Sequence, residues 1–295
     1  MKQEYYYFVS GLPNIIIDDT KLPWTPEEFL AEAKNQVSES DYRLLEILHL
    51  PMDMDNLLRV LYKSNKEHNN EGLYEDTFWE EYLVFLRAVV ENPELKTPVE
   101  FATLPSFIKE IIVKVLNQEE MQILPQTELE LLKQFYAWTA ESPNDFIRDW
   151  FAFDANLRNI LTAINGRNFN LPYAQYLIGD SETVVRLSKS HAADFGLGKD
   201  NDLFNALIRI YEQNNILYRE RGYDIVRWKW IDDYNFFNYF NIDRILGYYC
   251  QLRILARWIK SSPELGKEVF NSILSDLNNS FSFPADFNIR STQRK

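Results

Sequence analysis

Apolar side chains recur along most of the chain at intervals of three and four residues, the spacing that collects them on one face of an α-helix. The clearest run lies in residues 74–93, where Phe78, Tyr82, Phe85, Leu86 and Val89 share one face. The same spacing predicts helices within 22–33, 38–51, 53–64, 104–116, 127–142, 149–170, 201–222, 241–262 and 263–280. The pattern therefore predicts a protein of roughly a dozen helices.

Several of these helices carry start and stop signals. Thr25, Pro26 and Glu28 have the order of a capping box with proline in the first helical turn. Asp53 is expected to cap the helix that follows it. Gly166 and Gly222 are expected to end their helices as left-handed caps.

The two-residue alternation of a half-buried strand is rare in this chain. The opening "YYYFVSGL" and the segment Tyr223–Ile231 are the strand candidates, and both are ambiguous. The nine glycines in 295 residues disfavour sandwiches, barrels and glycine-rich nucleotide folds. We therefore predict an all-α fold, a single helical domain over residues 1–295 with at most one or two short strands.

The formal net charge is −13, which disfavours general binding to nucleic acid or to anionic lipid. The charge is uneven along the chain. The segment Leu207–Lys260 holds nine Lys/Arg and six Asp/Glu, whereas Glu67–Tyr82 holds six acids and no Lys or Arg. An acidic face opposite a mildly basic one suits docking between two unlike surfaces, and a solvated helix face explains the acidic run equally well.

The single cysteine, Cys250, excludes an intrachain disulfide, which fits a reducing compartment. No stretch reaches the ~18–20 apolar residues of a membrane-spanning helix. The apolar opening lacks the small-residue cleavage site of a signal peptide. We therefore expect a cytoplasmic protein.

No residue pattern indicates an enzyme, a cofactor or a metal site. The three histidines are far apart in the sequence. The pairs Asp18-Asp19 and Asp232-Asp233 lack the further carboxylates with which all-helical prenyl-transfer enzymes hold magnesium. The segment "FGLGKD" (195–200) has an aspartate where a P-loop needs a hydroxyl after its lysine.

Basic and aromatic residues alternate in residues 218–234, a mixture that can bind single-stranded nucleic acid or a protein. The residues that could form such an interface are Arg219, Arg221, Arg227, Trp228, Lys229 and Trp230. Interspersed acids such as Glu220 and Asp224 neutralise the segment and disfavour nucleic acid. A protein interface and ordinary packing of Arg and Lys stems over aromatic rings remain open.

The segment 149–170 carries a cluster of polar residues on a helix with one continuous apolar stripe. Asp154 and Arg158 are four residues apart, the order that favours a surface ion pair. Asn156 and Asn159 line another edge of the helix. These four residues are candidates for structural or interface roles and not for catalysis.

Three segments resemble one known family. "FDANLRNILTAINGR" (153–167) resembles a helix of the family of C subunits of V/A-type ATPases (the d subunits of eukaryotes), in which an acidic residue precedes Asn-Leu and a Lys or Arg. "YYYFVSGLPNI" with "SESDYRLLEILHLPMDMDNLLRVLYKS" is similar to that family's first repeat, and "NIDRILGYYCQLRILARWIKSS" to its last. The basic residues that follow in the middle helix of the family are missing here, and the acid usual in its final helix is not evident. More closely, the whole chain resembles a family of bacterial proteins encoded with V-type ATPase genes.

The resemblance implies a funnel-shaped protein with threefold pseudo-repeats, at roughly residues 1–115, 116–200 and 201–295. Such a protein is non-catalytic and lies in the central stalk of a rotary ATPase, where it links the rotor shaft to the membrane ring and transmits torque for ion transport. Its partners are the other ATPase subunits, which hold it peripheral to the inner membrane. Its middle-helix polar residues fix neighbouring helices or line a central cavity. The alternative is a helical scaffold or adaptor that binds proteins unrelated to ATPases.

Overall fold

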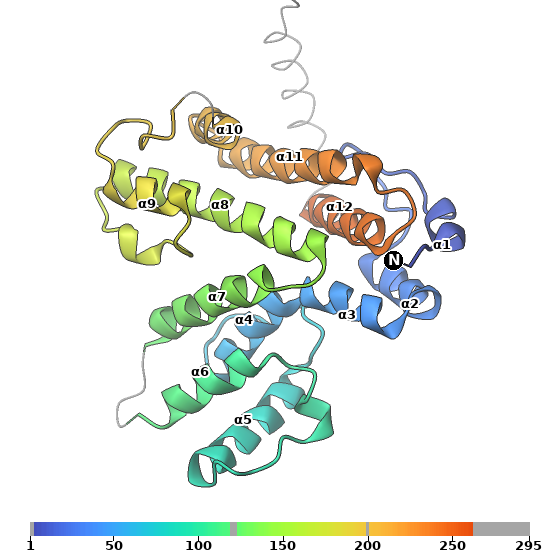
Figure 1. The fold of residues 1–295 in the computed structure, drawn as a ribbon, viewed down its shortest axis with the longest axis vertical. Helices are drawn as coiled ribbons and strands as arrows, with labels where there is room; N and C mark the ends of the chain where they lie inside the picture. Colours follow the sequence, from blue (N-terminus) through green and yellow to red (C-terminus); the bar gives the residue numbers. More distant parts are fainter. Residues whose placement is uncertain (1–2, 119–122, 199–200, 262–295) are drawn as a thin grey trace, which may run out of the picture.

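The computed structural model describes residues 3–118, 123–198 and 201–261. Within these ranges the chain forms twelve α-helices and three short 3-10 helices and no strand, so the predicted all-α fold is confirmed (Figure 1). The predicted helix at 263–280 and the end of the third pseudo-repeat lie outside the described residues. The threefold repeat and the funnel shape stay predictions.

Four consecutive helices form a bundle in the lower half of Figure 1: α4 (Leu50–Leu61), α5 (Asp76–Glu91), α6 (Ser106–Leu116) and α7 (Leu124–Ala140). Each packs on the next, and α7 returns to pack on α4. The short helix η1 (Val99–Phe101) lies between α5 and α6. Trp79, Ile108 and Phe135 are fully buried between them, so the apolar faces predicted from the sequence are the faces that meet.

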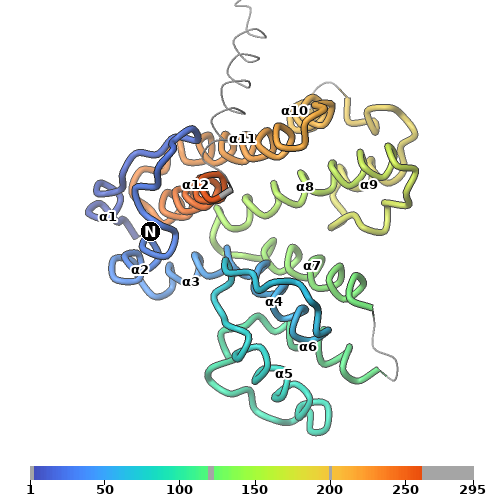
Figure 2. The backbone as a smooth tube through the Cα atoms, turned by 180° about the vertical axis from the view of Figure 1, so that it is seen from behind, coloured from blue at the N-terminus to red at the C-terminus, as the bar shows by residue number. Residues whose placement is uncertain are grey.

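Helix α8 (Asp145–Asn168) runs through the middle of the molecule (Figures 1 and 2). Its first half contributes Phe146 and Phe151 to a large hydrophobic cluster, which also includes the bundle. Its second half contributes Leu157 and Ile160 to a smaller cluster. One continuous helix therefore belongs to both hydrophobic clusters.

The smaller cluster is covered by short elements: η2 (Ala174–Tyr176), α9 (Glu182–Lys189) and α10 (Asp202–Tyr211). After it the chain returns through three elements: α11 (Ile216–Tyr234), η3 (Asn235–Phe237) and α12 (Ile242–Ser261). Helix α11 packs on α10 at one end and on α12 at the other.

The beginning of the chain packs against the last described helix. It contains α1 (Tyr6–Ser10), α2 (Pro26–Gln36) and α3 (Glu39–Ile47), of which α2 and α3 pack on α12. The backbone N–H of Tyr5 donates to the carbonyl of Phe240 at 2.6 Å, beside an isolated bridge between Glu4 and Asn241. Figure 2 shows the blue N-terminal segment beside the red and orange helices. The fold is thus closed by contacts between residues more than 200 positions apart, such as Arg253 Nη1 with the Leu48 carbonyl.

The capping box at Thr25 is confirmed, with the side chains of Thr25 and Glu28 each accepting from the other's backbone N–H. The predicted cap at Asp53 is wrong. Helix α4 begins at Leu50 with proline in its first turn, and Asp53 lies inside it, 1% exposed. Its carboxylate serves a loop instead, as described below.

The predicted helix ends at Gly166 and Gly222 are also wrong, because both glycines lie inside helices. A Cβ at Gly166 would lie 2.4 Å from the ring of Tyr173, and a Cβ at Gly222 would lie 2.7 Å from Ile210. Each glycine therefore permits a close approach of a neighbouring segment. The single helix predicted at 201–222 is in fact two, since Asn215 caps α11 by accepting from the Leu217 N–H.

Both strand candidates are helical. The opening segment forms α1, and Tyr223–Ile231 lies within α11. The buried residues of α11 include Asp224 and Trp228 on one face of the helix and Tyr223 on another. Because α11 is enclosed on several sides and buries charged groups, its apolar positions do not form the single stripe that marks an amphipathic helix.

Candidate functional site

Asp154 lies in the middle of α8, where the two hydrophobic clusters meet. Its Oδ2 accepts a hydrogen bond from the Tyr136 hydroxyl on α7 at 2.5 Å, and its Oδ1 accepts from Arg227 Nη2 on α11 at 3.3 Å. Burial and the nearby Asp154 carboxylate raise the pKa of Tyr136. The Nε of Arg158, the partner expected from the sequence, is 4.0 Å away. The contacts of Asp154 with α7 and α11 are therefore closer than its ion pair with Arg158 on its own helix.

Asp224 on α11 is 1% exposed and accepts hydrogen bonds from three side chains. Its Oδ2 accepts from Trp258 Nε1 at 2.6 Å and from Arg257 Nη2, both on α12. Its Oδ1 accepts from Arg227 Nη1 at 3.4 Å. Burial disfavours the charge on Arg227, but the carboxylates of Asp154 and Asp224 outweigh it and raise the pKa of Arg227. Arg227 thus bridges the two aspartates.

Arg221 extends these contacts to the N-terminal segment. It is 8% exposed, and its Nη2 donates to the Ile17 carbonyl and, at 3.3 Å, to Asp18 Oδ1. Its guanidinium lies 5.1 Å from the ring centroid of Trp258. Burial lowers the pKa of Arg221 against the opposing effect of Asp18. We call the whole set the ionic network: Asp18, Tyr136, Asp154, Arg221, Asp224, Arg227, Arg257 and Trp258.

The structure separates the four candidate residues of α8. Asp154 belongs to the ionic network, and Asn159 is 1% exposed and exchanges two hydrogen bonds with the backbone of Ile178, at 2.9 and 2.8 Å. Asn159 therefore holds the loop after η2 against α8. Asn156 is half-buried, and Arg158 is exposed.

The six basic and aromatic candidates all lie on α11 and do not share one exposed face: Arg219, Arg221, Arg227, Trp228, Lys229 and Trp230. Trp228 is buried, and Trp230 stacks on Phe153 of α8 with ring centroids 5.1 Å apart. Arg221 and Arg227 belong to the ionic network. Of the two interpretations left open, these contacts favour internal packing, with Lys229 remaining exposed.

Internal pairing also accounts for much of the uneven charge. Four of the nine basic residues between 207 and 260 pair with acids on other elements: Arg221, Arg227, Arg253 and Arg257. In the acidic run, Glu71 pairs with Arg253 at 2.6 Å and Asp76 pairs with Arg59. The basic segment is therefore less available for docking than its composition indicated.

The ionic network has the chemistry of a structural junction. Its carboxylates face guanidiniums, an indole N–H and a phenol, and it brings no nucleophile to an exposed position. Over the described part of the chain, no three His, Cys, Asp or Glu side chains are placed to hold a metal ion. Burial raises the pKa of Cys250 to about 12, which keeps its thiol protonated at neutral pH. Asp232 accepts a hydrogen bond from Gln251 at 2.6 Å.

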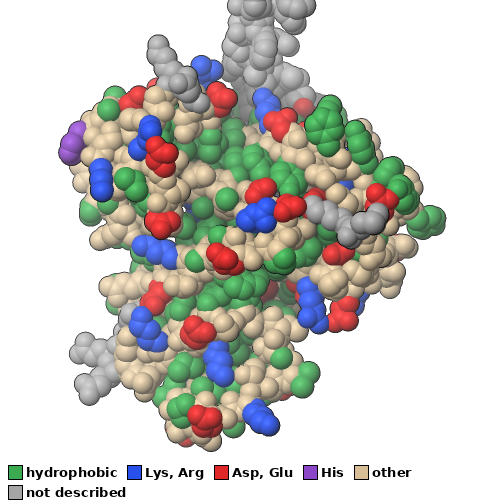
Figure 3. All heavy atoms as spheres, in the orientation of Figure 1, with side chains coloured by type: hydrophobic (Ala, Val, Ile, Leu, Met, Phe, Trp, Pro, Cys, Tyr) green, Lys and Arg blue, Asp and Glu red, His purple; other side chains and the backbone are tan. Residues whose placement is uncertain are grey.

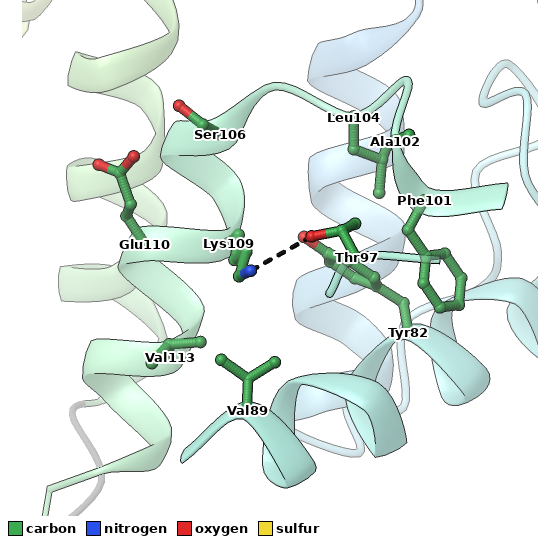
Figure 4. Close-up of a pocket in the computed structure, with 10 residues that line it drawn as sticks. All are labelled: Tyr82, Val89, Thr97, Phe101, Ala102, Leu104, Ser106, Lys109, Glu110 and Val113. Atoms are coloured by element: carbon green, nitrogen blue, oxygen red, sulfur yellow. Dashed lines mark hydrogen bonds between the residues drawn. The ribbon is translucent and has the colours of Figure 1, made fainter. Parts of the chain in front are cut away.

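A second feature is a groove of about 550 Å³ between α5, η1 and α6 (Figure 4). Its walls are mostly apolar and include Tyr82, Phe101 and Val113. The Lys109 ammonium donates to Thr97 Oγ1 at 3.2 Å and lies 5.5 Å from the Phe85 ring centroid. These two contacts give Lys109 a structural role, because its stem packs over a ring and its ammonium has a hydrogen-bond acceptor. The groove therefore has the features of an apolar recess and not of a reaction centre.

Sequence reasoning missed one set of polar residues, which runs from the N-cap residue of α4 into the helix. His49, Asp53 and Asn56 lie at i, i+4 and i+7 and are each at most 5% exposed. We call them the α4 polar stripe. Polar residues at helical spacing, next to the apolar positions of the helix, were the signal that could have revealed it.

The side chains of the α4 polar stripe bind backbone groups of the acidic loop that precedes α5. His49 Nδ1 lies 2.6 Å from the Glu71 carbonyl, and Asp53 Oδ1 accepts from the N–H groups of Leu73 and Tyr74, at 2.9 and 3.2 Å. Asn56 exchanges two hydrogen bonds with the backbone of Asn69, at 3.0 and 2.8 Å. The stripe therefore fixes the path of this loop.

Asp154→Asn is expected to lower the free energy of unfolding by about 1.5 kcal/mol, because the amide weakens charge-assisted bonds to Arg227 and Tyr136. Arg158→Ala is the matched control on the same helix. Its side chain is 52% exposed, so a change below about 0.5 kcal/mol is expected. Urea unfolding of both variants measures the difference, and equal effects would contradict the assignment of Asp154 to the network.

Comparison with known proteins identifies a family. No curated protein and no solved structure matches the chain significantly. Among the described helices, none combines the length and apolar character needed to cross a membrane. The family model "Protein of unknown function (DUF2764)" matches residues 1–281, nearly the whole sequence, and the chain therefore belongs to the DUF2764 family.

Proposed function

We propose that this protein is a non-catalytic component of the central stalk of a bacterial V/A-type rotary ATPase. In this role it links the rotor shaft to the membrane ring and transmits torque for ion transport. It is held peripheral to the inner membrane by the other proteins of the complex.

The observation that carries the proposal is the packing of the three segments on which the resemblance rests. Helix α12, from the last segment, packs on α3 of the first and on α8 of the middle one. Within the first segment, the Tyr5 hydroxyl donates to Asp41 Oδ2 and accepts from the Ser38 N–H at 3.3 Å. The polar residues that resemble the first repeat of the ATPase family thus contact one another, as residues of a common motif are expected to do.

The ionic network supplies the stiffness that torque transmission requires. It joins α7, α8, α11, α12 and the N-terminal segment by ion pairs and by hydrogen bonds that have directional geometry. Sliding one helix past another would leave buried charges without partners, which is strongly unfavourable. The helices are therefore held at fixed relative positions.

Affinity purification from membranes tests the proposal. The full chain, tagged at its own locus, is expected to recover the catalytic, shaft and ring proteins of a rotary ATPase from detergent-solubilised membranes. The untagged parent strain is the control for non-specific recovery. Recovery of the tagged chain without any rotary ATPase protein would reject the proposal in favour of a scaffold or adaptor with other partners.

Deletion of the gene provides an independent measurement. A torque-transmitting part is needed to couple the two halves of the machine, so membranes from the deletion strain should lose ATP-driven ion uptake. Restoring the gene should restore uptake. Undiminished uptake in the deletion strain would contradict a coupling role even if the proteins copurify.

A further inference from the structure

Five aromatic side chains are exposed together where the connection between α11 and α12 meets the N-terminal segment. They are Tyr6, Tyr7, Phe236, Phe237 and Tyr239, with exposed fractions between 55% and 82%. We call them the aromatic patch. The Tyr6 ring lies 4.6 Å from the ring of Phe240, which joins the two segments. Figure 3 shows hydrophobic side chains gathered at the upper right, over the N-terminal segment and the end of α11.

The exposure of these rings is built into an ordered turn. Three asparagines occur at every third position of "YNFFNYFNI", and two of them hydrogen-bond to backbone groups in it or just after it. Asn235 is buried, Asn238 Nδ2 donates to the Tyr234 carbonyl at 3.1 Å, and Asn241 Oδ1 accepts from the Arg244 N–H at 3.2 Å. The rings between the asparagines are therefore presented outward by a backbone already fixed in place, which reduces the entropy cost of binding.

The edge of the aromatic patch is acidic. Glu4 precedes the two tyrosines and accepts a hydrogen bond from the Tyr6 hydroxyl. Asp232 and Asp233 are exposed in the last turn of α11, which leads directly into the phenylalanines, and Asp232 accepts a hydrogen bond from Gln251. The nearest basic residues along the chain are Lys229 before them and Arg244 after the turn. The patch thus combines aromatic rings, which dominate binding energy at protein interfaces, with a rim in which acids outnumber bases.

We propose that the aromatic patch is a docking surface for a helical segment of another protein that carries apolar residues and Lys or Arg. The rings would bury the apolar side chains of the partner. The carboxylates would pair with its basic groups, and the ring faces also attract cations. This inference does not rest on the proposed function, since it follows from the surface alone.

The charge of the rim distinguishes this partner from two other occupants. A surface of anionic lipid would face Glu4, Asp232 and Asp233 and a chain of net charge −13, and would be repelled. A second copy related by a twofold axis would bring the same acidic rim against itself. A basic and apolar protein segment avoids both penalties.

Peptide binding to the full chain tests the docking surface. The probe is a fluorescent peptide of about 15 residues with leucines at helical spacing and lysines between them. The control peptide has glutamate in place of each lysine. We expect the lysine peptide to bind, with affinity that falls as salt rises. Phe236→Ser with Phe237→Ser should weaken binding by at least about tenfold. Asp233→Lys should also weaken it.

The matched control replaces two apolar side chains exposed elsewhere, Phe169→Ser with Leu171→Ser, which are 63% and 60% exposed. This variant should bind the lysine peptide as the native chain does. Equal loss in both double variants, equal binding of the glutamate peptide, or no binding at all would overturn the proposal. So would a dimer in sedimentation, or attachment to phosphatidylglycerol vesicles, that the Phe236/Phe237 variant abolishes.

Discussion

Replacing Asp224 with alanine is expected to lower the free energy of unfolding by about 3–5 kcal/mol. The carboxylate accepts from Arg227, Arg257 and Trp258 at a position that is 1% exposed. Its removal takes away the carboxylate that two guanidinium groups and an indole N–H face, in a largely buried site. Urea unfolding followed by circular dichroism at neutral pH measures the change.

Asp233→Ala is the matched control for this prediction, because Asp233 is an acid on the same helix and is exposed. Its effect should stay within about 0.5 kcal/mol. If Asp224→Ala cost less than about 1 kcal/mol, the ionic network would not be the junction that we describe, and it would not stiffen the packing of the helices.

Asp53→Asn is expected to change how stability depends on pH. Burial raises the pKa of Asp53 to about 7, against the opposing hydrogen bonds from the N–H groups of Tyr74 and Leu73. Between the unfolded pKa of about 4 and the folded pKa, the native state holds a proton that the unfolded state has lost. The contribution of Asp53 to stability is therefore fully present below about pH 4 and is lost as pH rises towards 7.

The comparison of the two proteins isolates this group, because every other titration is common to both. Relative to Asp53→Asn, the native chain should lose about 2 kcal/mol of unfolding free energy between pH 5 and pH 7. The asparagine keeps an oxygen that can accept from Leu73 and Tyr74, so the loop contacts are retained. Parallel pH profiles for the two proteins would show that Asp53 is ionised in the native state throughout this range.

Amphipathic helices with proline or threonine at their ends were the part of the fold that could be predicted from sequence. The helix at Pro26–Gln36 follows from its capping box, and Asp76–Glu91 follows from its apolar stripe. Each of these helices buries one face and exposes the other, so the pattern of apolar residues along the chain identifies the buried face. Local information was sufficient because the local and the tertiary preferences agree.

Helix α11 shows where this reasoning fails. It buries Arg221 and Asp224 beside Tyr223 and Trp228, and the partners that make these charges tolerable lie on α8, α12 and the N-terminal segment. No pattern within 216–234 reveals partners so distant in sequence. The predicted helix ends at the glycines were wrong for the same reason. A glycine is needed at position 166 because Tyr173 packs against it, and not because the backbone of its own helix ends there.

The candidate site was predicted in pieces that the structure joins. Asp154 was selected from one segment and Arg227 from another, for unrelated reasons, and the two are hydrogen-bonded across 73 residues. From the sequence, Asp224 is one of the acids that neutralise a basic stretch, whereas in the structure it accepts from three of the donors in the network. The sequence could identify individual residues as candidates. It could not predict which of them pair, because the pairing depends on how α8 crosses α11.

The packing of α2 and α3 on α12 has a consequence for how the chain is made. On a ribosome, the N-terminal segment through α3 emerges long before α12, which supplies Tyr249 and Arg253 to His49 and Leu48. Phe29, fully buried in the finished protein beside Tyr248 and Tyr249, has no such cover until then. Folding of the first helices must wait until α12 has been translated, and during this interval the nascent chain is a natural client for chaperones that bind exposed apolar segments.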